Sequence, residues 1–490
     1  MTKLFRALLT CALFISVQTL AFDTFITRDQ HRLMDGNKEF RFAGIHAPEL
    51  HRIEDDSRGP CKADPRGWGQ YFKWPTALEQ ENWIKALVKS GHKAMRVYVL
   101  SVGTEWDAAC GRETHILAPT EKNGLPRINE TAMIHYDSMI SLADKHGLRL
   151  ILPFIDHWKW WGGREQLAAF YGEKEDDFYN VKSKTYAAYQ YIIQEVINRK
   201  NTISGRLYKD EPAIMAWETG NELKGSTEAF VKNTAAHIKS LDTNHLVLDG
   251  TYLKVNPSSL DDPNVDIISN HFYTVNHNNN PAQILKDLKA IDAKKVYIIG
   301  EYGLKDAAGL NDIMQAAVNT TYKGARAAGA FIWGFRGHRE VGGYYWHKEY
   351  TGHYSYHIPG FAGNDGNEER TVVDLVRKAQ AQMNGMKNAP ALPVPEAPLL
   401  HAIGNPKAIN WMGAPLGRYY KVERSASRLG PWKVIAEKIS DGRNEYDPSN
   451  DSVFSDTGKL SPGEYFYRVY AQNESGISPA SNTMSVTVSP

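Results

Sequence analysis

Eight short runs of apolar and β-branched residues recur between positions 40 and 335 of the chain. Most are almost continuously hydrophobic, as expected for strands that are buried on both faces of a parallel sheet. Most of the segments between them carry apolar residues three and four positions apart, which is the spacing of an amphipathic helix. The predicted strands occupy residues 40–47, 93–100, 148–155, 213–219, 245–251, 266–273, 295–303 and 329–335.

Three of the intervening segments show a clear helical pattern and end at a glycine, at Gly91, Gly147 and Gly329. Glycine is the usual residue where a helix stops in the left-handed conformation. The segment after Thr251 is only weakly helical. Alternating strands and helices predict an α/β fold, a (β/α)8 barrel of the TIM type with long loops. A doubly wound open sheet is the alternative, disfavoured because no glycine-rich phosphate motif follows the first strand.

The pattern changes after the predicted barrel. Residues 388–398 are rich in proline, as in a semi-rigid extended linker. Short alternating runs separated by Gly, Pro, Asn and Ser follow, which is typical of an all-β sandwich. We therefore expect a barrel over residues 22–387 and a small immunoglobulin-like sandwich over residues 399–490.

The first 21 residues have the layout of a secretory signal peptide. Lys3 and Arg6 precede an apolar run, and Thr19 and Ala21 form a small-x-small cleavage signal. An uncleaved anchor is disfavoured because the run is shorter than ~20 apolar residues. We expect a secreted or periplasmic protein without a membrane span.

Removal of the signal peptide leaves two cysteines, Cys61 and Cys110. In an exported protein a disulfide is favoured over two free thiols, and here it would join the loops after the first and second strands. The cysteines lie in separate segments without nearby histidine spacing, so we expect no structural metal, and no cofactor.

Charge and composition narrow the choice of partner. The chain has 57 basic and 56 acidic residues, a formal net charge of +1, which gives no support for nucleic acid or an anionic membrane. Its 12 Trp and 25 Tyr residues instead suggest flat faces for stacking on sugar rings. We expect a monomer that acts on a polysaccharide or oligosaccharide.

Polar side chains stand where several of the predicted strands end. In a (β/α)8 barrel these positions meet at one rim, where the chemistry takes place. Two carboxylates among aromatic residues and one arginine suit glycoside hydrolysis, with one carboxyl protonated and the other ionised. The carboxylates are Glu222 and Glu301, and the other rim residues are Arg96, Asn221, His271, Tyr273 and Trp333.

A third glutamate, Glu218, precedes Glu222 by four positions. Both side chains point to the same side of the strand, about 13 Å apart at ~3.3 Å per residue. We interpret Glu218 as structural, paired with an inner cation such as Arg96. For Glu301 a helix cap or a solvated strand-end charge is the alternative. We expect Arg96 to lie near Glu301 and keep it ionised.

The order of these rim residues resembles the retaining β-glycanases of glycoside hydrolase clan A, family 5. The resemblance implies that Glu222 is the acid/base and Glu301 the nucleophile. It also implies that Asn221 binds the sugar hydroxyl next to the reacting carbon. His271 and Tyr273 would then orient the carboxylate pair, and Trp333 would form the floor of the site.

Residues 157–223 are similar to the region before the acid/base in endo-β-1,4-mannanases of that family. They share Trp-x-x-Gly-Gly, Asp-Asp-Phe, Asn-Arg-x-Asn and Tyr-x-x-(Asp/Glu)-Pro. Leu223 departs from the pattern because proline usually follows Asn-Glu. The aromatic loop 337–361 is also unlike the mannanases, and as an inserted loop it could close one end of the cleft. The segment 467–482, with Trp411 upstream, resembles a fibronectin type III domain.

The predicted function is therefore hydrolysis of β-1,4-mannosidic bonds in mannan, glucomannan or manno-oligosaccharides. The alternatives are another family 5 β-glycanase or exo-β-glycosidase, and a non-catalytic carbohydrate-binding protein. Aromatic side chains after the third strand should stack on sugar rings, with a histidine supporting the site. These are Trp158, Trp160, Trp161 and His157, and further candidates for subsite walls are Trp346, Trp106, Tyr345 and His347.

Overall fold

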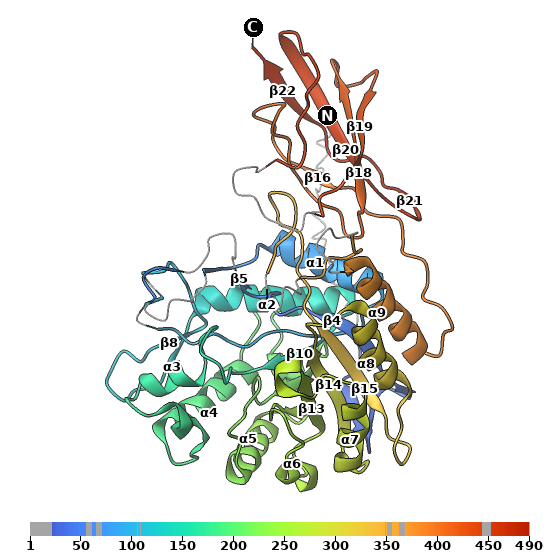
Figure 1. Cartoon of the computed structure of the whole chain (residues 1–490). Coiled ribbons are helices and arrows are strands. Elements are labelled where there is room, and N and C mark those ends of the chain that lie inside the picture. Colours follow the sequence, from blue (N-terminus) through green and yellow to red (C-terminus); the bar gives the residue numbers. More distant parts are fainter. Residues whose placement is uncertain are drawn as a thin grey trace, which may run out of the picture.

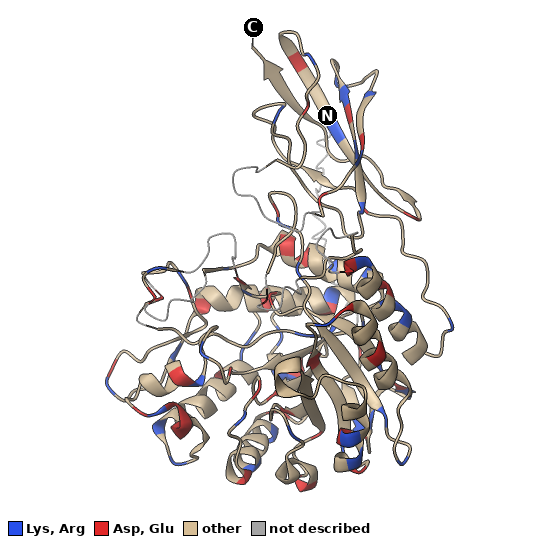
Figure 2. Cartoon of the chain, viewed as in Figure 1, with Lys and Arg blue, Asp and Glu red and all other residues tan. Residues whose placement is uncertain are grey.

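The computed structural model describes residues 22–54, 61–64, 71–104, 106–107, 109–347, 349, 355–361, 368–442 and 452–489. A barrel of parallel strands surrounded by helices makes up the larger part, and an all-β unit extends from one side of it (Figure 1). Acidic and basic residues are interspersed along the ribbon of both parts, in keeping with the near-zero net charge (Figure 2).

The barrel sheet has the strand order β4-β15-β14-β13-β12-β11-β10-β7, with all its pairs parallel. Each strand falls within or largely overlaps one predicted apolar run, and every strand residue is buried, which confirms the predicted (β/α)8 barrel. The strands are β4 (Phe42–His46), β7 (Ala94–Arg96), β10 (Arg149–Pro153), β11 (Ile214–Glu218), β12 (Leu246–Asp249), β13 (Ile267–Phe272), β14 (Val296–Tyr302) and β15 (Ala327–Trp333).

The barrel closes between β4 and β7 through contacts outside a regular ladder. The Ile45 amide donates to His92 Nε2 at 3.0 Å, and the Tyr98 amide donates to Pro48 O at 3.2 Å. The first and second strands of the barrel are thereby held side by side, and the residues that follow them share one rim.

Helices cover the outside of the barrel. α1 begins with a capping box between Thr76 and Glu79 and ends at Gly91 with φ +110°, and α2 ends at Gly147 with φ +80°, so both predicted glycine stops are confirmed. The helices are α1 (Ala77–Ser90), α2 (Glu130–His146), α3 (Arg164–Ala169), α4 (Lys184–Ile197), α5 (Glu228–Leu241), α6 (Pro257–Asp261), α7 (Ala282–Ile291), α8 (Ala307–Asn319) and α9 (Glu369–Met383). The five-residue α6 agrees with the weak helical pattern after Thr251.

The third predicted helix stop, at Gly329, is wrong. α8 ends at Asn319, because Thr320 already has the extended values φ −70° and ψ 130°. Gly329 lies inside β15, where an added Cβ would be 1.9 Å from the Phe42 ring. The glycine is therefore required for packing between β15 and β4.

Short elements complete the barrel domain. They are β1 (Ile26–Asp29), β2 (Arg32–Asp35), β3 (Lys38–Glu39), β5 (Ile53–Glu54), β6 (Phe72–Lys73), β8 (Ile116–Leu117), β9 (Arg127–Ile128), η2 (Glu175–Tyr179), η3 (Tyr208–Asp210) and η4 (Thr274–Asn276).

The described residues of the C-terminal unit form β-strands and no helix, as the alternating pattern predicted, and the strands pair antiparallel. A two-stranded sheet, β16-β17, and a five-stranded sheet share a core that includes Trp411, Tyr420, Val422 and Tyr467. Its strands are β16 (Leu399–Leu400), β17 (Trp411–Met412), β18 (Tyr419–Ser425), β19 (Lys433–Ile439), β20 (Gly463–Asn473), β21 (Gly476–Ile477) and β22 (Met484–Val488). Residues 384–398, between α9 and β16, form neither helix nor strand.

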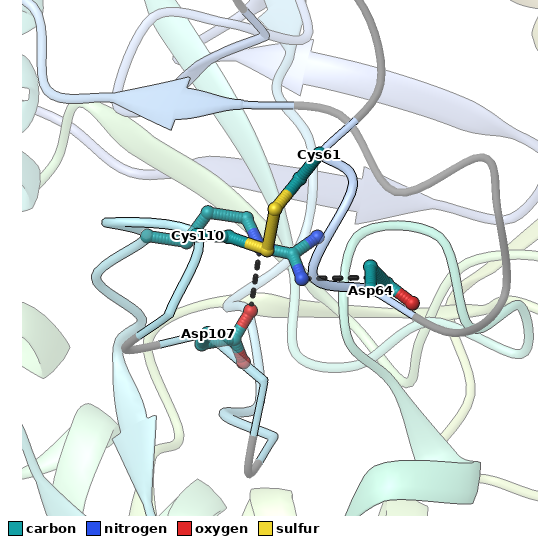
Figure 3. The surroundings of a disulfide bond; sticks show 5 residues. Cys61, Asp64, Asp107 and Cys110 are labelled. Atoms are coloured by element: carbon teal, nitrogen blue, oxygen red, sulfur yellow. Dashed lines mark hydrogen bonds and ion pairs between the residues drawn. A yellow bond between two sulfur atoms is a disulfide. The ribbon is translucent and has the colours of Figure 1, made fainter.

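Cys61 and Cys110 form a disulfide (Figure 3). Cys61 lies between β5 and β6, and Cys110 lies between β7 and β8. The predicted bond between the loops after the first and second barrel strands is thus confirmed. Beside it, the buried Arg112 pairs with Asp64 at 2.8 Å and with Asp107 at 2.9 Å.

Within the described residues, no helix has both the length and the apolar content needed to cross a bilayer. The predicted signal peptide, residues 1–21, lies outside the described part of the chain.

Candidate active site

Glu222 and Glu301 come together at the rim of the barrel. His271 Nδ1 lies 2.9 Å from Glu222 Oε1 and 3.6 Å from Glu301 Oε2. One oxygen of each carboxylate and one ring nitrogen of His271 lie within 4.8 Å of one another. The two predicted carboxylates therefore form a close pair.

The backbone after β11 holds Glu222 in a strained conformation. Its φ of +54° lies in the left-handed region, which residues with a side chain rarely adopt. The turn is fixed on both sides, because the Asn221 amide donates to Ile155 O at 2.7 Å and the Leu223 amide donates to Gly250 O at 2.9 Å. Proline has no amide hydrogen, so the departure at Leu223 adds a hydrogen bond that holds this turn.

Arg96 is fully buried and contacts several site residues at once. Its Nε and Nη2 pair with the two oxygens of Glu218 at 2.6 and 2.7 Å, and its Nη1 lies 2.6 Å from Glu301 Oε1. Nη2 also donates to Asn221 Oδ1 at 2.9 Å, and Nη1 lies 3.0 Å from His46 Nε2. The predicted Glu218–Arg96 pair and the predicted position of Arg96 beside Glu301 are both confirmed.

Burial controls the proton affinities of the two carboxylates. It raises the pKa of Glu222 to about 7, although the hydrogen bond from Trp158 and the charge of Arg96 oppose this shift. It also raises the pKa of Glu301, although His271, Arg96 and the Tyr273 hydroxyl (2.9 Å from Oε2) oppose it. Arg96 therefore stabilises ionised Glu301 as predicted, but the loss of solvent is the larger effect and the net direction is upward.

Burial also determines the state of His271. It lowers the histidine pKa to about 4, so the ring is neutral at neutral pH.

Three buried residues that the sequence analysis missed support the pair. His46 contacts Arg96, and burial lowers the pKa of the His46 ring well below its usual range. Asp156 accepts hydrogen bonds from the Asn221 amide at 2.9 Å and from the Tyr98 hydroxyl at 3.0 Å, and burial raises its pKa to about 8. His46 and Asp156 both stand at strand ends, so the rule that selected the other rim residues would have found them.

The pair faces a cavity of about 560 Å³. Trp158 lies on its wall, where the indole Nε1 donates to Glu222 Oε2 at 2.5 Å. The wall combines aromatic rings with a few polar groups, as in many sugar sites. Besides both glutamates it includes the predicted Asn221, Tyr273, Trp158, Trp160, Trp333 and His347, and also Glu54, Tyr98, Tyr252, Val275, Leu304 and Glu349.

The expectation that Trp161 stacks on a sugar ring is wrong. Its side chain is 2% exposed, and its Nε1 donates to Val99 O at 3.0 Å. Its ring packs edge-on against Phe72 at 4.9 Å. The Gly162 amide donates to Lys159 O at 3.2 Å, so the chain turns over residues 159–162, and Trp161 belongs to the interior.

Not all of the predicted aromatic wall residues line the cavity. Among the described residues, Trp346, Tyr345 and Trp106 do not line it: the Tyr345 hydroxyl donates to Glu79, and Trp106 lines a separate cavity. His157 supports the wall indirectly, because its ring packs edge-on against Trp158 at 4.8 Å.

The aromatic loop, residues 337–361, reaches the cavity as its sequence suggested. Glu349 Oε1 accepts from Trp333 Nε1 at 2.6 Å and lies 3.1 Å from His347 Nε2. His347 Nδ1 is 3.2 Å from Glu54 Oε2. Residues 348 and 350–354 of this loop lie outside the described part of the chain.

The two glutamates and the histidine between them also have the composition of a cation site. Glu222, His271 and Glu301 would each offer one ligand atom. All four carboxylate oxygens, however, already have partners in the chain. Those of Glu222 contact His271 and Trp158, and those of Glu301 contact Arg96 and Tyr273. The guanidinium of Arg96 already places a permanent positive charge 2.6 Å from Glu301 Oε1 and would repel a metal ion. The pair is therefore better suited to acid–base chemistry than to holding a metal.

Residues 76–301, which include Arg96 and both glutamates, match the family described as "GH family 5 beta-mannosidase-like". Mannan endo-1,4-beta-mannosidase F of Aspergillus clavatus is 39% identical over 150 residues, 29% of this chain and 30% of that protein. Mannan endo-1,4-beta-mannosidase 1 of Oryza sativa subsp. japonica is 35% identical over 147 residues, 27% of this chain and 34% of that protein. The chain thus spans about a third of the length of these relatives.

Solved structures share the fold. An endo-1,4-beta-mannanase from Rhizomucor miehei superposes with a TM-score of 0.56 at 18% identity, covering 72% of this chain and 100% of that one. An endo-beta-1,4-mannanase from Thermotoga petrophila gives a TM-score of 0.54 at 18% identity, covering 93% of this chain and 99% of that one. Both agree with a (β/α)8 barrel.

Proposed function

We propose that this chain cleaves β-1,4-mannosidic bonds with retention of configuration at the anomeric carbon. Its residues 76–301 match the mannosidase-like model of glycoside hydrolase family 5, and its relatives include mannanases. The observation that carries the proposal is the buried pair Glu222 and Glu301, joined through His271 in an aromatic-walled cavity. Carboxyl groups lie about 5–5.5 Å apart in retaining enzymes and about 6.5–9.5 Å apart in inverting ones. One oxygen of each carboxylate lies within 4.8 Å of the other, which is compatible with the shorter spacing, and the choice of retention rests on the resemblance to family 5.

In the first step, a carboxylate oxygen of Glu301 attacks the anomeric carbon while Glu222 gives its proton to the departing glycosidic oxygen. This produces a covalent glycosyl-enzyme. In the second step, Glu222 takes a proton from a water molecule, which adds to the same carbon and releases Glu301. A pKa of about 7 suits Glu222 to both roles near neutral pH.

The neighbouring residues are assigned supporting roles. Arg96 and Tyr273 each contact one oxygen of Glu301, which places that carboxylate for attack. Asn221 binds the hydroxyl next to the reacting carbon. Trp333 forms the floor, and Trp158 and Trp160 stack on neighbouring sugar rings.

The substrate class rests on the relatives, which are named mannan endo-1,4-beta-mannosidases. The carboxylate pair alone does not choose a sugar. Loop 337–361 brings His347 and Glu349 to the cavity wall, which favours action on short chains or chain ends. Another family 5 β-glycanase or exo-β-glycosidase is the second candidate, because the loop departs from the mannanase pattern. A non-catalytic sugar-binding protein is disfavoured by the intact pair.

The remaining features of the proposal come from the sequence. The chain is secreted or periplasmic after loss of residues 1–21, acts as a monomer on a polysaccharide or oligosaccharide, and carries a fibronectin type III-like sandwich after a proline-rich linker at residues 388–398.

Product analysis tests the proposal. The purified protein is incubated with mannan, glucomannan, cellulose, xylan and manno-oligosaccharides, and the first anomer released is identified by NMR. We expect mannose-containing products whose reducing ends appear first as the β-anomer. Faster cleavage of cellulose or xylan would refute the choice of mannan, and initial release of the α-anomer would refute retention. Mannotriose trimmed to mannose with mannan viscosity unchanged would establish exo cleavage.

A further inference from the structure

The all-β unit, called the sandwich below, packs against one side of the barrel (Figure 1). There it contacts α1 and loop 337–361. At the start of the loop, His338 Nε2 lies 3.2 Å from Asp441 Oδ2 of the sandwich, and both side chains are buried. His338 Nδ1 lies 3.0 Å from Asn82 Oδ1 of α1, and Asn82 Nδ2 donates to Gly413 O of the sandwich at 2.7 Å. The beginning of the loop is thus enclosed between α1 and the sandwich.

The sandwich holds the end of the same loop as well. Arg418 donates to the carbonyl oxygens of Gly360 and Pro359. The Phe361 ring packs directly on Gly442, where an added Cβ would lie 2.3 Å from the ring. Arg418 is 4% exposed, and a charged side chain that is this deeply buried needs hydrogen-bond partners in fixed positions. Its contacts with the two carbonyl oxygens therefore hold the end of the loop against the sandwich.

Contacts within the loop connect its two ends to its central part. The Tyr344 ring stacks on His338 at 3.9 Å, and its hydroxyl donates to Ile358 O at 3.1 Å. His357 Nε2 lies 2.9 Å from Tyr345 O. The next residues toward the middle of the loop include His347, which faces the cavity. A shift at either end is therefore transmitted to the cavity wall.

The middle of the loop contacts the floor of the cavity. Glu349 Oε1 accepts from the indole of Trp333, and His347 joins Glu349 to Glu54. Each of these four side chains lines the cavity that contains the carboxylate pair.

We propose that the C-terminal sandwich is a positioning element of the active site. Asp441 and Arg418 fix the two ends of loop 337–361, so that Glu349 holds the Trp333 indole in place beside the carboxylates. The kinetic part of this inference rests on the proposed glycosidase function, whereas the order of the loop is measured without any substrate.

Two variants of the full chain remove these clamps, Asp441→Asn and Arg418→Gln. Each has a matched control inside the sandwich. Asp456→Asn alters another buried aspartate, which accepts from Tyr467 at 2.8 Å. Arg468→Gln alters another arginine, which pairs with Glu423 at 2.7 Å. The measurements are hydrogen exchange of residues 337–361, and kcat and KM on mannotriose.

We expect both clamp variants to exchange faster in residues 337–361, while the rest of the barrel stays protected. Their kcat/KM should fall by up to about a hundredfold, because a misplacement of ~1 Å can cost about that much. Their KM should rise, because the displaced residues line the cavity that would hold the sugar. Loss of folded enzyme alone would lower kcat and leave KM unchanged. The controls should match the wild type in both measurements.

Clamp variants with wild-type exchange in residues 337–361 would overturn the proposal, as would controls that loosen the loop equally. If the wild-type chain cleaved no glycoside, the proposed function would fail while the exchange experiment would still decide this inference.

Discussion

The hydrogen bond from Trp158 to Glu222 should set the alkaline limit of the reaction. The indole Nε1 donates to Glu222 Oε2 at 2.5 Å and favours the ionised carboxylate, so it lowers a pKa that burial raises to about 7. Trp158→Phe keeps an aromatic ring on the cavity wall but removes the donor. The pKa of Glu222 should therefore rise, and the alkaline limb of kcat/KM should move to higher pH.

The size of the shift follows from the strength of the bond. A hydrogen bond to a charged group contributes about 1.5–3 kcal/mol, and one pKa unit corresponds to about 1.4 kcal/mol. Trp158 is 39% exposed, so water can replace part of the lost bond and the lower figure applies. We expect an upward shift of about one pH unit.

The assay is the pH dependence of kcat/KM on a manno-oligosaccharide. A substrate with an activated leaving group is unsuitable because it departs without a proton from Glu222. Trp160→Phe is the matched control, since Trp160 lines the same cavity and its indole has no hydrogen bond to either glutamate among the described contacts. Its alkaline limb should stay in place. An unchanged or lowered limb in Trp158→Phe would refute the reasoning.

Three further changes test the site and the fold. Glu222→Ala should lower kcat on oligosaccharides by about 10²–10⁴-fold, with azide partly restoring turnover of activated substrates; near-wild-type turnover would contradict the assignment. Replacing Cys61 and Cys110 by serine opens a loop with a sequence separation of 49 and should lower the free energy of unfolding by up to about 4 kcal/mol. An unchanged melting temperature would argue against this. Glu218→Gln removes a negative charge that raises the Glu222 pKa, so the alkaline limb of kcat/KM should move to lower pH. The same change breaks the buried pair with Arg96 and should lower the free energy of unfolding by about 3–5 kcal/mol, measured by denaturant titration.

The barrel could be predicted because both faces of its strands are buried, which makes each strand a continuous apolar run. The pattern failed at the end of α8. The residues after Asn319 keep enough alanine to continue a helical spacing, and the strand that holds Gly329 begins with Ala327 and Ala328 rather than with β-branched residues. The prediction placed a helix stop where packing against Phe42 requires a glycine.

The position of the site could also be predicted, because polar residues at the ends of parallel strands meet at one rim. The direction of single side chains in long loops could not. Trp158, Trp160 and Trp161 look equivalent in the sequence, but only Trp161 of the three is buried in the interior. The role of Glu349 was equally hidden, since its contact with Trp333 depends on the path of a loop without a repeating pattern.

The different roles proposed for the two carboxylates rest on their partners rather than on burial, because burial raises the pKa of both. Glu301 contacts the guanidinium of Arg96 directly, whereas the partners of Glu222 among the described residues are a neutral indole and a neutral imidazole. If both were ionised, they and Glu218 would place three negative charges around the single cation of Arg96. One proton relieves this repulsion, and it costs least on the carboxylate that lacks direct contact with the cation. We therefore expect the proton on Glu222, which is the group that donates it to the leaving oxygen in the proposed mechanism.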